Sequence, residues 1–343
     1  MENSVFENLK LQLSTPKNIV LIPHRNPDGD AMGSSLGMSK FLKNLGHRTQ
    51  VVLPNEIPDF LKWMPGVDQV YNFEKQNRQS VKALEEADLV FLLDFNAFHR
   101  VGDVMGAKLE SLDTQFVMID HHQAPDPITE MMYSDTSICA TCQMAFHFIE
   151  RLKALESIDA DVATCLYTGI MTDTGSFKFP STTSTTHRVI ADLIDRGADN
   201  ARIHNLVFDQ NSYNRLQLLG QSLSNMKILV DCHTAYICLS DEELRAHNFQ
   251  KGDTEGVVNY ALSVKGVTMA AIFIEDIPQG IIKISFRSKG SFSVNKFARA
   301  YFNGGGHDNA SGGRSTESLE ATAKRFVELV EQHKSEIQKS YEG

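Results

Sequence analysis

The sequence predicts an α/β protein in which an open parallel sheet in the first half is followed by a second, smaller α/β domain. Two observations lead to this fold class. In the first half, short apolar runs alternate with helical patterns, as is typical of strands that are buried on both faces. The chain of 343 residues is also longer than one hydrophobic core usually serves, so two domains are expected.

Four segments of the first half are expected to be strands, because each is a short run rich in branched apolar residues. A helix is expected between the first two, from about 32 to 45, with Asp30 as its N-cap. A strand, a helix and a second strand in this order form a β-α-β unit, which pairs its strands in parallel. The four expected strands are NIVLIPH (18–24), RTQVVLP (48–54), ADLVFLLD (87–94) and FVMIDHH (116–122).

Helical patterns dominate from about 137 to 225, and short strands return after them. The polar residues 209–225 are expected to connect the two domains. The first domain then covers residues 1–208 and the second covers 226–343. Within the second, strands are expected near 226–231, 234–239, 267–275 and 281–286, and helices near 293–302 and 316–336.

The composition predicts a soluble, cytoplasmic protein. No apolar run approaches the roughly 18 residues that a membrane-spanning helix needs, so no membrane partner is expected. The first residues, MENSVFENLKLQL, lack the basic start and apolar stretch of a secretory signal. The five cysteines are an odd number, which indicates reduced thiols. We interpret Cys139 and Cys142 as small apolar residues on one helical face, since no second pair completes a zinc site.

The charge distribution favours a small anionic ligand. The formal net charge of −10 argues against binding of long duplex nucleic acid, which needs a broad basic surface. Residues 281–314 nevertheless contain six basic side chains and one acid, a local charge of +5. A local basic patch in an acidic chain suits a small phosphate-bearing molecule.

Acidic and histidine side chains follow three of the expected strands at their carboxyl ends. In open parallel sheets these ends meet in one crevice, where so many acids would repel one another unless cations were bound. Each residue also has an ordinary explanation, such as a turn, a helix cap or a helix end. The joint pattern favours a metal site. Its members are His24, Asp28, Asp30, Asp94, Asp120, His121, His122 and, after an apolar helix, Asp173.

One motif suggests a competing chemistry. Residues 33–37, GSSLG, match the G-x-S-x-G nucleophile elbow of α/β-hydrolases. That motif places the serine on a sharp turn directly after a strand. Ser35 is instead expected several residues inside a helix, so we interpret it as a helix-packing residue.

Six segments, in order, resemble the motifs of a known family. HRNPDGDAMGSS, LLDFN, IDHH and TDTGSF resemble the four motifs of the DHH phosphoesterase superfamily, and ISFRSKG and NGGGHDNASGG resemble its companion DHHA1 domain. The resemblance covers nearly the whole chain. It implies a catalytic metal-binding domain at 1–208, a substrate-binding domain at 226–343, and an active-site cleft between them.

The resemblance also implies the metal ligands. Two divalent ions, usually manganese, are expected, and Asp94 is expected to bridge them. Carboxylate oxygens and imidazole suit such an ion. Two ions of this kind activate a water for in-line attack at phosphorus, without a covalent enzyme intermediate. The ligands are expected to be His24, Asp28 and Asp94 for one ion and Asp30, Asp94, His121 and Asp173 for the other.

Further roles follow from the same resemblance. Asp120 is expected to orient a histidine, and His122 to contact the phosphate or donate a proton. Arg287 and His307 are expected to bind the substrate. Gly305 and Gly306, with Gly304, would let backbone N–H groups approach an anion, although a glycine run on its own indicates a flexible loop. Arg100 is a further phosphate-binding candidate, with a solvated loop arginine as its alternative.

The arrangement most resembles the nanoRNase and pAp-phosphatase group, which hydrolyses short oligoribonucleotides such as pApA and 3′-phosphoadenosine 5′-phosphate. A stand-alone phosphodiesterase of cyclic di-adenylate or linear dinucleotides, a RecJ-type single-strand exonuclease and a family II pyrophosphatase are alternatives within the superfamily. A non-catalytic nucleotide-binding regulatory module is an alternative of another class. The sequence leaves the oligomeric state open, a homodimer included.

Overall fold

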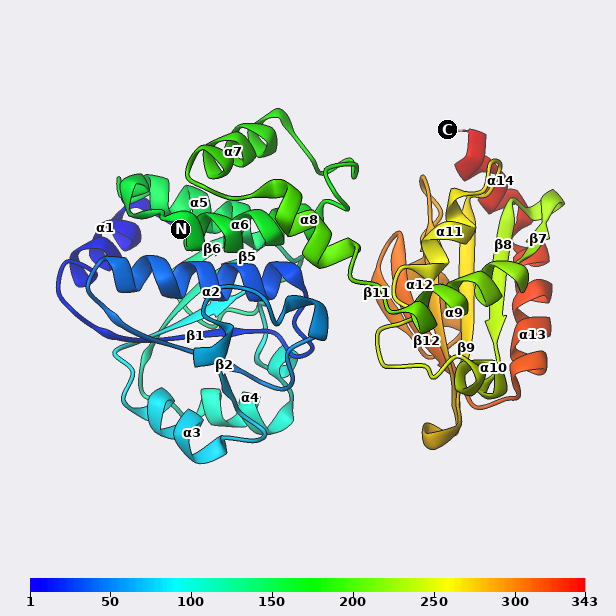
Figure 1. The fold of residues 1–343 in the computed structure, drawn as a ribbon, viewed down its shortest axis with the longest axis horizontal. Coiled ribbons are helices and arrows are strands. Elements are labelled where there is room, and N and C mark those ends of the chain that lie inside the picture. The colour runs from blue at the N-terminus through cyan, green and yellow to red at the C-terminus, as the bar shows by residue number, and fades with distance from the viewer. Residues whose placement is uncertain (343) are drawn as a thin grey trace. The chain divides into compact units, whose positions relative to one another are not determined.

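The structure, a computed structural model, describes residues 1–342. The chain divides into two compact units, Met1–Gln210 and the residues from Asn211 onward. Each unit contains its own six-stranded sheet with helices packed against it (Figure 1). The expected fold class, a parallel α/β domain followed by a second α/β domain, is confirmed.

The sheet of the first unit is entirely parallel, with the order β3-β2-β1-β4-β5-β6. All four expected strands form. Two short edge strands were not expected, because two or three residues carry no readable pattern. The strands are β1 (Asn18–Pro23), β2 (Arg48–Leu53), β3 (Tyr71–Asn72), β4 (Leu89–Leu93), β5 (Gln115–Asp120) and β6 (Met132–Ser134).

Helices cover both faces of this sheet, which explains why the central strands β1 and β4 are almost continuously apolar. Alternate strand residues enter two separate cores. Leu21 and Phe91 pack into the core that includes α2, α5 and α6. Val20 and Val90 pack into the core that includes α3 and α4. The helices of this unit are α1 (Asn3–Gln12), α2 (Gly29–Asn44), α3 (Asn77–Glu85), α4 (Asp103–Glu110), α5 (Thr141–Arg151), α6 (Ala160–Asp173), α7 (Ser184–Asp195) and α8 (Asn200–Phe208).

Helix α2 begins earlier than expected, and its N-cap is Asp28 rather than Asp30. The Oδ1 atom of Asp28 accepts hydrogen bonds from the backbone N–H groups of Asp30 (3.0 Å) and Ala31 (3.1 Å). Asp30 therefore lies in the first turn of α2, and its side chain is not used to cap this helix. Ser35 lies inside α2, as expected, and so cannot form a nucleophile elbow after a strand.

Helices α2 and α6 pack unusually closely, and glycines make this possible. A Cβ atom at Gly33 would lie 2.5 Å from the carbonyl oxygen of Cys165. A Cβ atom at Gly169 would lie 2.2 Å from Cys142 Sγ and 2.8 Å from Asp30 Oδ1. Gly33, the first glycine of the G-x-S-x-G motif, therefore allows α2 and α6 to pack closely.

The two cysteines of the C-x-x-C motif are buried and reduced. Their expected placement on one helical face is wrong, because Cys139 precedes α5 and only Cys142 lies in it. The Sγ atom of Cys139 donates to Gln143 Oε1 at 3.1 Å, and burial raises the pKa of this thiol to about 11. Such a thiol stays protonated and unreactive.

The sheet of the second unit has the order β11-β12-β10-β9-β8-β7 and is antiparallel except between β8 and β9. Strands β11 and β12 were not expected, because their glycine-rich sequence resembles a loop. The strands are β7 (Lys227–Leu229), β8 (Thr234–Leu239), β9 (Met269–Asp276), β10 (Ile281–Ser288), β11 (Gly305–His307) and β12 (Ala310–Ser315).

The residues expected as a connector, 209–225, are mostly helical. Ser212 caps α9 (Tyr213–Ser224) by accepting from the backbone N–H of Arg215, and Leu218 is buried in a core of the second unit. The helix agrees with the helical pattern expected up to about residue 225, but it belongs to the second unit instead of connecting the two units. The other helices of this unit are α10 (Asp241–Ala246), α11 (Val257–Ser263), α12 (Val294–Tyr301), α13 (Leu319–Gln332) and α14 (Lys334–Glu342).

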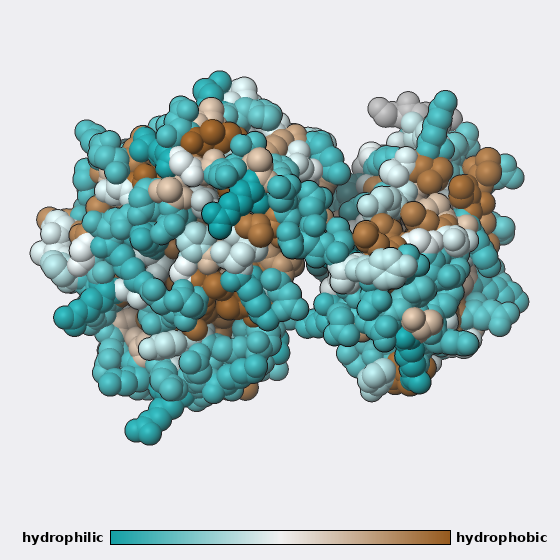
Figure 2. Space-filling view, viewed as in Figure 1, coloured by the Kyte–Doolittle hydropathy of each residue, from teal (hydrophilic) through white to brown (hydrophobic). Residues whose placement is uncertain are grey.

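The surface of both units is largely hydrophilic on the face shown in Figure 2, with hydrophobic side chains in small patches. Within residues 1–342, none of the helices has the length and apolar character needed to cross a membrane.

Candidate metal centre and substrate-binding residues

One group of potential metal ligands lies where β1 and β4 end. His24 follows β1 directly, Asp28 caps α2, and Asp94 follows β4. The Nε2 atom of His24 lies 3.4 Å from Asp94 Oδ2 and 3.8 Å from Asp28 Oδ2. These three donor atoms are close enough together to hold one ion.

A second group surrounds His121, directly after β5. Its Nε2 atom lies 3.5 Å from Asp173 Oδ2, 3.6 Å from Asp94 Oδ1 and 4.0 Å from Asp30 Oδ2. Asp30, His121 and Asp173 also have donor atoms close enough to hold an ion. Asp94 therefore presents one carboxylate oxygen to each group, as a bridging ligand would.

Asp94 is held in a backbone conformation that few residues adopt. Its φ angle is +65°, in the left-handed region that Asp and Asn tolerate better than other non-glycine residues. The backbone N–H of Asp94 donates to the carbonyl oxygen of Ile119 at 3.1 Å, which ties the end of β4 to β5. This turn directs the Asp94 side chain between the two groups. The unusual backbone conformation costs roughly 1–3 kcal/mol of conformational free energy.

The electrostatics of the cluster fit bound cations. Burial, followed by the charge of Asp30, raises the pKa of Asp94 and of Asp173 well above the ordinary value. Burial also opposes protonation of His24, but the hydrogen bond and charge of Asp94 and the charge of Asp28 outweigh it and raise the pKa to about 9. Without metal, protons must neutralise these acids. Carboxylate oxygens with imidazole nitrogens suit Mn²⁺ or a similar divalent ion, so the residues present fit such ions.

Metal affinity should therefore increase with pH. A metal ion requires the unprotonated Nε2 atom of His24, and a proton competes for it below a pKa of about 9. Between about pH 6 and pH 8, the affinity for Mn²⁺ should rise by up to about tenfold per pH unit for each proton displaced. Isothermal titration calorimetry in buffers of different ionisation enthalpy measures both the affinity and the protons released. An affinity that is independent of pH would contradict this account.

Helix α5 supports the cluster through contacts that the sequence did not reveal. Its N-cap residue, Ala140, has no side chain that can cap. Asp30 takes over this function from 111 residues away: Oδ2 accepts from the backbone N–H of Thr141 (2.6 Å) and Oδ1 from that of Cys142 (2.8 Å). The hydroxyl of the fully buried Thr141 also donates to Asp94 Oδ1 at 2.9 Å. The only available signal was a helix start without a capping residue.

Replacing Thr141 should weaken metal binding without removing a ligand. Thr141→Val keeps the side-chain shape but loses the hydroxyl that fixes Asp94, so the affinity for Mn²⁺ should fall by about 10- to 100-fold. Thr141→Ser, which keeps the hydroxyl, is the matched control and should lose far less. Calorimetric titration of both variants tests this, and equal losses would show that the hydroxyl does not position the carboxylate.

Asp120 and His122 form a separate pair beside the cluster. Asp120 is fully buried, and its Oδ1 atom lies 2.7 Å from Nδ1 of His122. Its Oδ2 atom accepts from the backbone N–H of His122 at 3.0 Å. The ring of His122 is thus fixed at Nδ1, as expected for a histidine oriented by a carboxylate. His122 Nδ1 also lies 3.8 Å from Asp94 Oδ1.

The substrate-binding candidates of the second unit share one row of its sheet. Arg287 of β10 pairs with Ala310 of β12, and Ala310 pairs with His307 of β11. Directly paired residues project to the same face, so Arg287 and His307 flank the small Ala310. Burial lowers the pKa of Arg287, which indicates a guanidinium that an anion would stabilise.

The expected glycine nest is a strand in the structure. Gly305 and Gly306 lie in β11, an edge strand, opposite Gly312 and Ser311 of β12. Gly306 has a φ angle of +147°, and a Cβ atom there would lie 2.6 Å from the carbonyl oxygen of Ala310. The glycines let the hairpin close tightly beside His307.

Arg100 lies in the short helical turn Phe98–Val101, shortly after Asp94. Its carbonyl oxygen accepts from the backbone N–H of Arg25 at 2.9 Å, so this turn is tied to the residue that follows His24. Its side chain is partly exposed.

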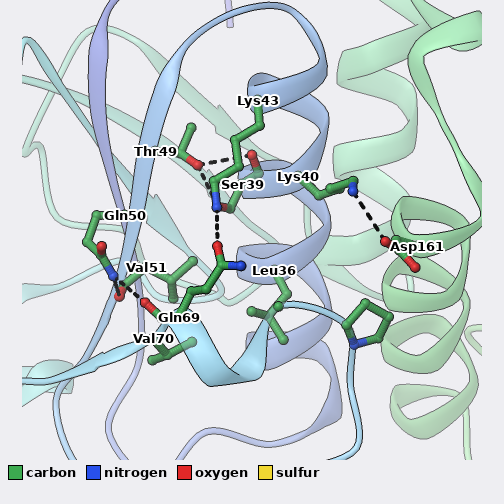
Figure 3. Close-up of a pocket in the computed structure, with 12 residues that line it drawn as sticks. Leu36, Ser39, Lys40, Lys43, Thr49, Gln50, Val51, Gln69, Val70 and Asp161 are labelled. Atoms are coloured by element: carbon green, nitrogen blue, oxygen red, sulfur yellow. Dashed lines mark hydrogen bonds and ion pairs between the residues drawn. The ribbon is translucent and has the colours of Figure 1, made fainter.

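A cavity of about 170 Å³ in the first unit belongs to a different place (Figure 3). It lies among α2, β2 and α6 and includes none of the metal-ligand candidates. Its polar side chains bind one another: Lys43 Nζ donates to Gln69 Oε1 at 2.7 Å, and the hydroxyls of Ser39 and Thr49 lie 2.7 Å apart. We therefore assign it no ligand.

Comparisons with known proteins agree with this architecture. The N-terminal domain of the DHH family matches residues 18–170, and the DHHA1 domain matches residues 232–336. The bifunctional oligoribonuclease and PAP phosphatase NrnA of Thermus thermophilus is 31% identical over 91% of this chain and 89% of its own length. NrnA of Bacillus subtilis is 27% identical over 88% of this chain and 90% of its own.

A solved structure is similar over the whole chain. The exopolyphosphatase-related protein from Bacteroides fragilis has a TM-score of 0.95 and 37% identity, with 98% of both chains covered. The fold, the acidic site and these similarities define the class of the protein: it is a phosphoesterase, a hydrolase of phosphoric esters. It belongs to the DHH family and carries a DHHA1 domain as its second unit.

Proposed function

We propose that this protein hydrolyses short oligoribonucleotides, such as pApA, and 3′-phosphoadenosine 5′-phosphate, with two divalent ions, manganese first among them. The observation that carries the proposal is the placement of Asp94, whose Oδ2 atom faces His24 at 3.4 Å while Oδ1 faces His121 at 3.6 Å. Asp94 could in this way contribute one ligand oxygen to each of two neighbouring metal ions. The similarity to the two NrnA proteins supports the choice of substrates.

Each metal group would be held by the residues that the structure brings together: His24, Asp28 and Asp94 for one ion, and Asp30, Asp94, His121 and Asp173 for the other. When bound, two such ions lower the pKa of a water and stabilise negative charge on the phosphoryl oxygens. The protein supplies the positioning. Thr141 fixes Asp94, and the backbone N–H groups of α5 fix Asp30, so the ligand oxygens are set before substrate arrives.

His122 is proposed to act on the substrate directly. Its Nδ1–H group donates to Asp120, and Nε2 is the ring nitrogen that we propose to contact a phosphoryl oxygen or to deliver a proton to the leaving group. Asp120 would hold the ring and stabilise its charged form. Arg287 and His307 are proposed to bind the phosphate of the substrate, with Gly305 and Gly306 allowing close approach, and Arg100 is a further phosphate contact.

The test is a comparison of substrates with the purified protein and Mn²⁺. We expect turnover of pApA and 3′-phosphoadenosine 5′-phosphate, and much slower turnover of pyrophosphate and polyphosphate. Cyclic di-adenylate and longer single-stranded DNA separate the two related phosphodiesterase alternatives. A protein that binds Mn²⁺ but hydrolyses none of these would be a regulatory nucleotide-binding module instead, and preference for polyphosphate would overturn the proposed substrates.

A further inference from the structure

Aromatic and histidine side chains gather at the surface of the first unit, directly beyond the metal-ligand candidate Asp173. Phe177 and Phe179 lie in the loop that follows α6, His187 lies in α7, and His204 and Phe208 lie in α8. We call these five residues the aromatic surface. Helix α6 packs against both α7 and α8 (Figure 1), and the loop that follows α6 contacts both later helices through Phe177.

Four rings of the aromatic surface form a continuous set, and Phe179 lies beside it over Gly175. Phe177 lies 6.0 Å from His187 and 6.3 Å from His204, and His204 lies 5.9 Å from Phe208, measured between ring centroids. The fully buried Tyr167 of α6 supports them from below, 5.8 Å from Phe177. The outer members remain open to solvent: Phe179 is 45% exposed and Phe208 is 44% exposed. Exposed apolar rings fixed from beneath form a surface on which another flat ring can stack.

The loop that carries the two phenylalanines is locally strained. Gly175, Ser176 and Phe177 have consecutive φ angles of +57°, +62° and +66°, which is a costly conformation for a residue as large as Phe. The Oγ atom of Ser176 lies 3.0 Å from Nε2 of His204, which ties this turn to α8. Non-glycine residues kept in such conformations cluster at ligand-binding sites.

The strained turn brings an aromatic ring close to the metal cluster. A Cβ atom on Gly175 would lie 2.5 Å from the Phe179 ring, so that ring covers the glycine. Gly175 is two residues beyond Asp173, a Cα separation of at most about 7 Å. The ring of Phe179 is therefore within the reach of a nucleotide whose phosphate lies at the metal cluster.

The charge of this region also suits a nucleotide. The segment from 174 to 191 contains Lys178, His187 and Arg188 and has no Asp or Glu, although the chain as a whole carries a net charge of −10. Exposed rings beside basic side chains are the combination with which proteins bind single-stranded nucleotides, through base stacking and phosphate attraction. The basic side chains lie on the part of the aromatic surface formed by the loop and α7, whereas Asp209 follows Phe208 at the end of α8.

We propose that the aromatic surface is a stacking platform for a nucleobase of the substrate, with Phe179 nearest the metal cluster and Phe208 at its outer end. The inference rests on the proposed function, because it assigns the base of the same nucleotide. Stacking uses the π-face that every base has and reads no sequence. The enzyme should therefore accept all four bases but bind an abasic nucleotide weakly.

The experiment compares pApA with an analogue in which an abasic sugar replaces one adenosine. For Phe179→Leu, which keeps apolar volume but loses the ring, KM for pApA should rise by about 5- to 100-fold, while kcat changes little. One of the abasic analogues lacks the base that would stack on the aromatic surface. For this analogue, Phe179→Leu should not raise KM. Phe208→Leu should show the same selectivity with a smaller effect. Tyr341→Leu, at a ring that is 51% exposed in the second unit, is the matched control and should behave as wild type.

Phe179→Tyr keeps the ring and should restore the wild-type KM, and thermal melting confirms that each variant is folded. Unchanged KM for pApA in both leucine variants would overturn the inference, and so would equal increases for pApA and for every abasic analogue. If the wild type hydrolyses no nucleotide, the proposed function fails. The inference is then decided by fluorescence: a dinucleotide containing 2-aminopurine should be quenched on binding to the wild type and not to Phe179→Leu.

Discussion

Asp94→Asn should reduce turnover by about 10³-fold or more, because it removes the charge that both metal groups share. Asparagine is the suitable replacement, since it has nearly the same shape and tolerates the φ angle of +65° at this position. Activity assays with Mn²⁺ and calorimetric titration should show the loss of both metal-binding events. Without metal, the variant should melt at a higher temperature than the wild type at neutral pH, because the buried Asp94 must take up a proton on folding, whereas asparagine is already neutral.

The matched control for this variant lies at the other end of the same strand. Asp88 precedes β4, and its side chain accepts from the backbone N–H of Asn18 at 2.8 Å, far from the carboxyl end where the cluster forms. Asp88→Asn should leave metal binding and activity unchanged. If Asp94→Asn still bound two ions with wild-type affinity, the bridging assignment would be wrong.

Arg287→Ala should weaken substrate binding and leave metal binding intact. The loss of a charge-assisted hydrogen bond to phosphate corresponds to an increase in KM of about 10- to 100-fold. Arg287→Lys keeps a charge but not the two-pronged guanidinium, so its KM should lie between those of the wild type and the alanine variant. Steady-state kinetics with pApA and calorimetry with Mn²⁺ provide the two measurements.

Arg245 offers a control in the same unit. It is an exposed arginine on α10 that pairs with Asp241 at 2.6 Å, and Arg245→Ala should leave KM unchanged. If Arg287→Ala lost metal as completely as Asp94→Asn, the separation of metal binding and substrate binding between the two units would not hold.

The parts of the fold that were predictable are those in which the sequence pattern is long and local. β1, β2, β4 and β5 each contain a run of at least three buried residues that are mostly apolar, and helices on both faces require this pattern. β11 and β12 could not be read, because glycines that close a hairpin look the same as glycines of a loop. The packing of α9 into the second unit was not predicted, because its polar face outweighs the few apolar residues that it buries.

In the candidate site, too, the features that depend on local pattern and strand order were predictable, and those that depend on contacts between distant residues were not. The ends of parallel strands meet at one edge of a sheet, so residues after β1, β4 and β5 could be assigned to one cluster from topology alone. The role of Asp30 as the cap of α5 could not be assigned, because it depends on a contact between residues 111 positions apart. Thr141 was missed for the same reason, since nothing in its neighbourhood distinguishes it from other helical threonines.

The close packing of α2 against α6 limits which substitutions the protein can accept. At Gly169, a single added methyl group would collide with Asp30 and with Cys142, although glycine itself has no side chain that could act in catalysis. A library screened for activity would therefore mark this glycine as if it were catalytic, and a design that fills space to gain stability would inactivate the enzyme there. Which side chains position 169 can accept is therefore determined by the space that the metal-ligand candidate Asp30 needs.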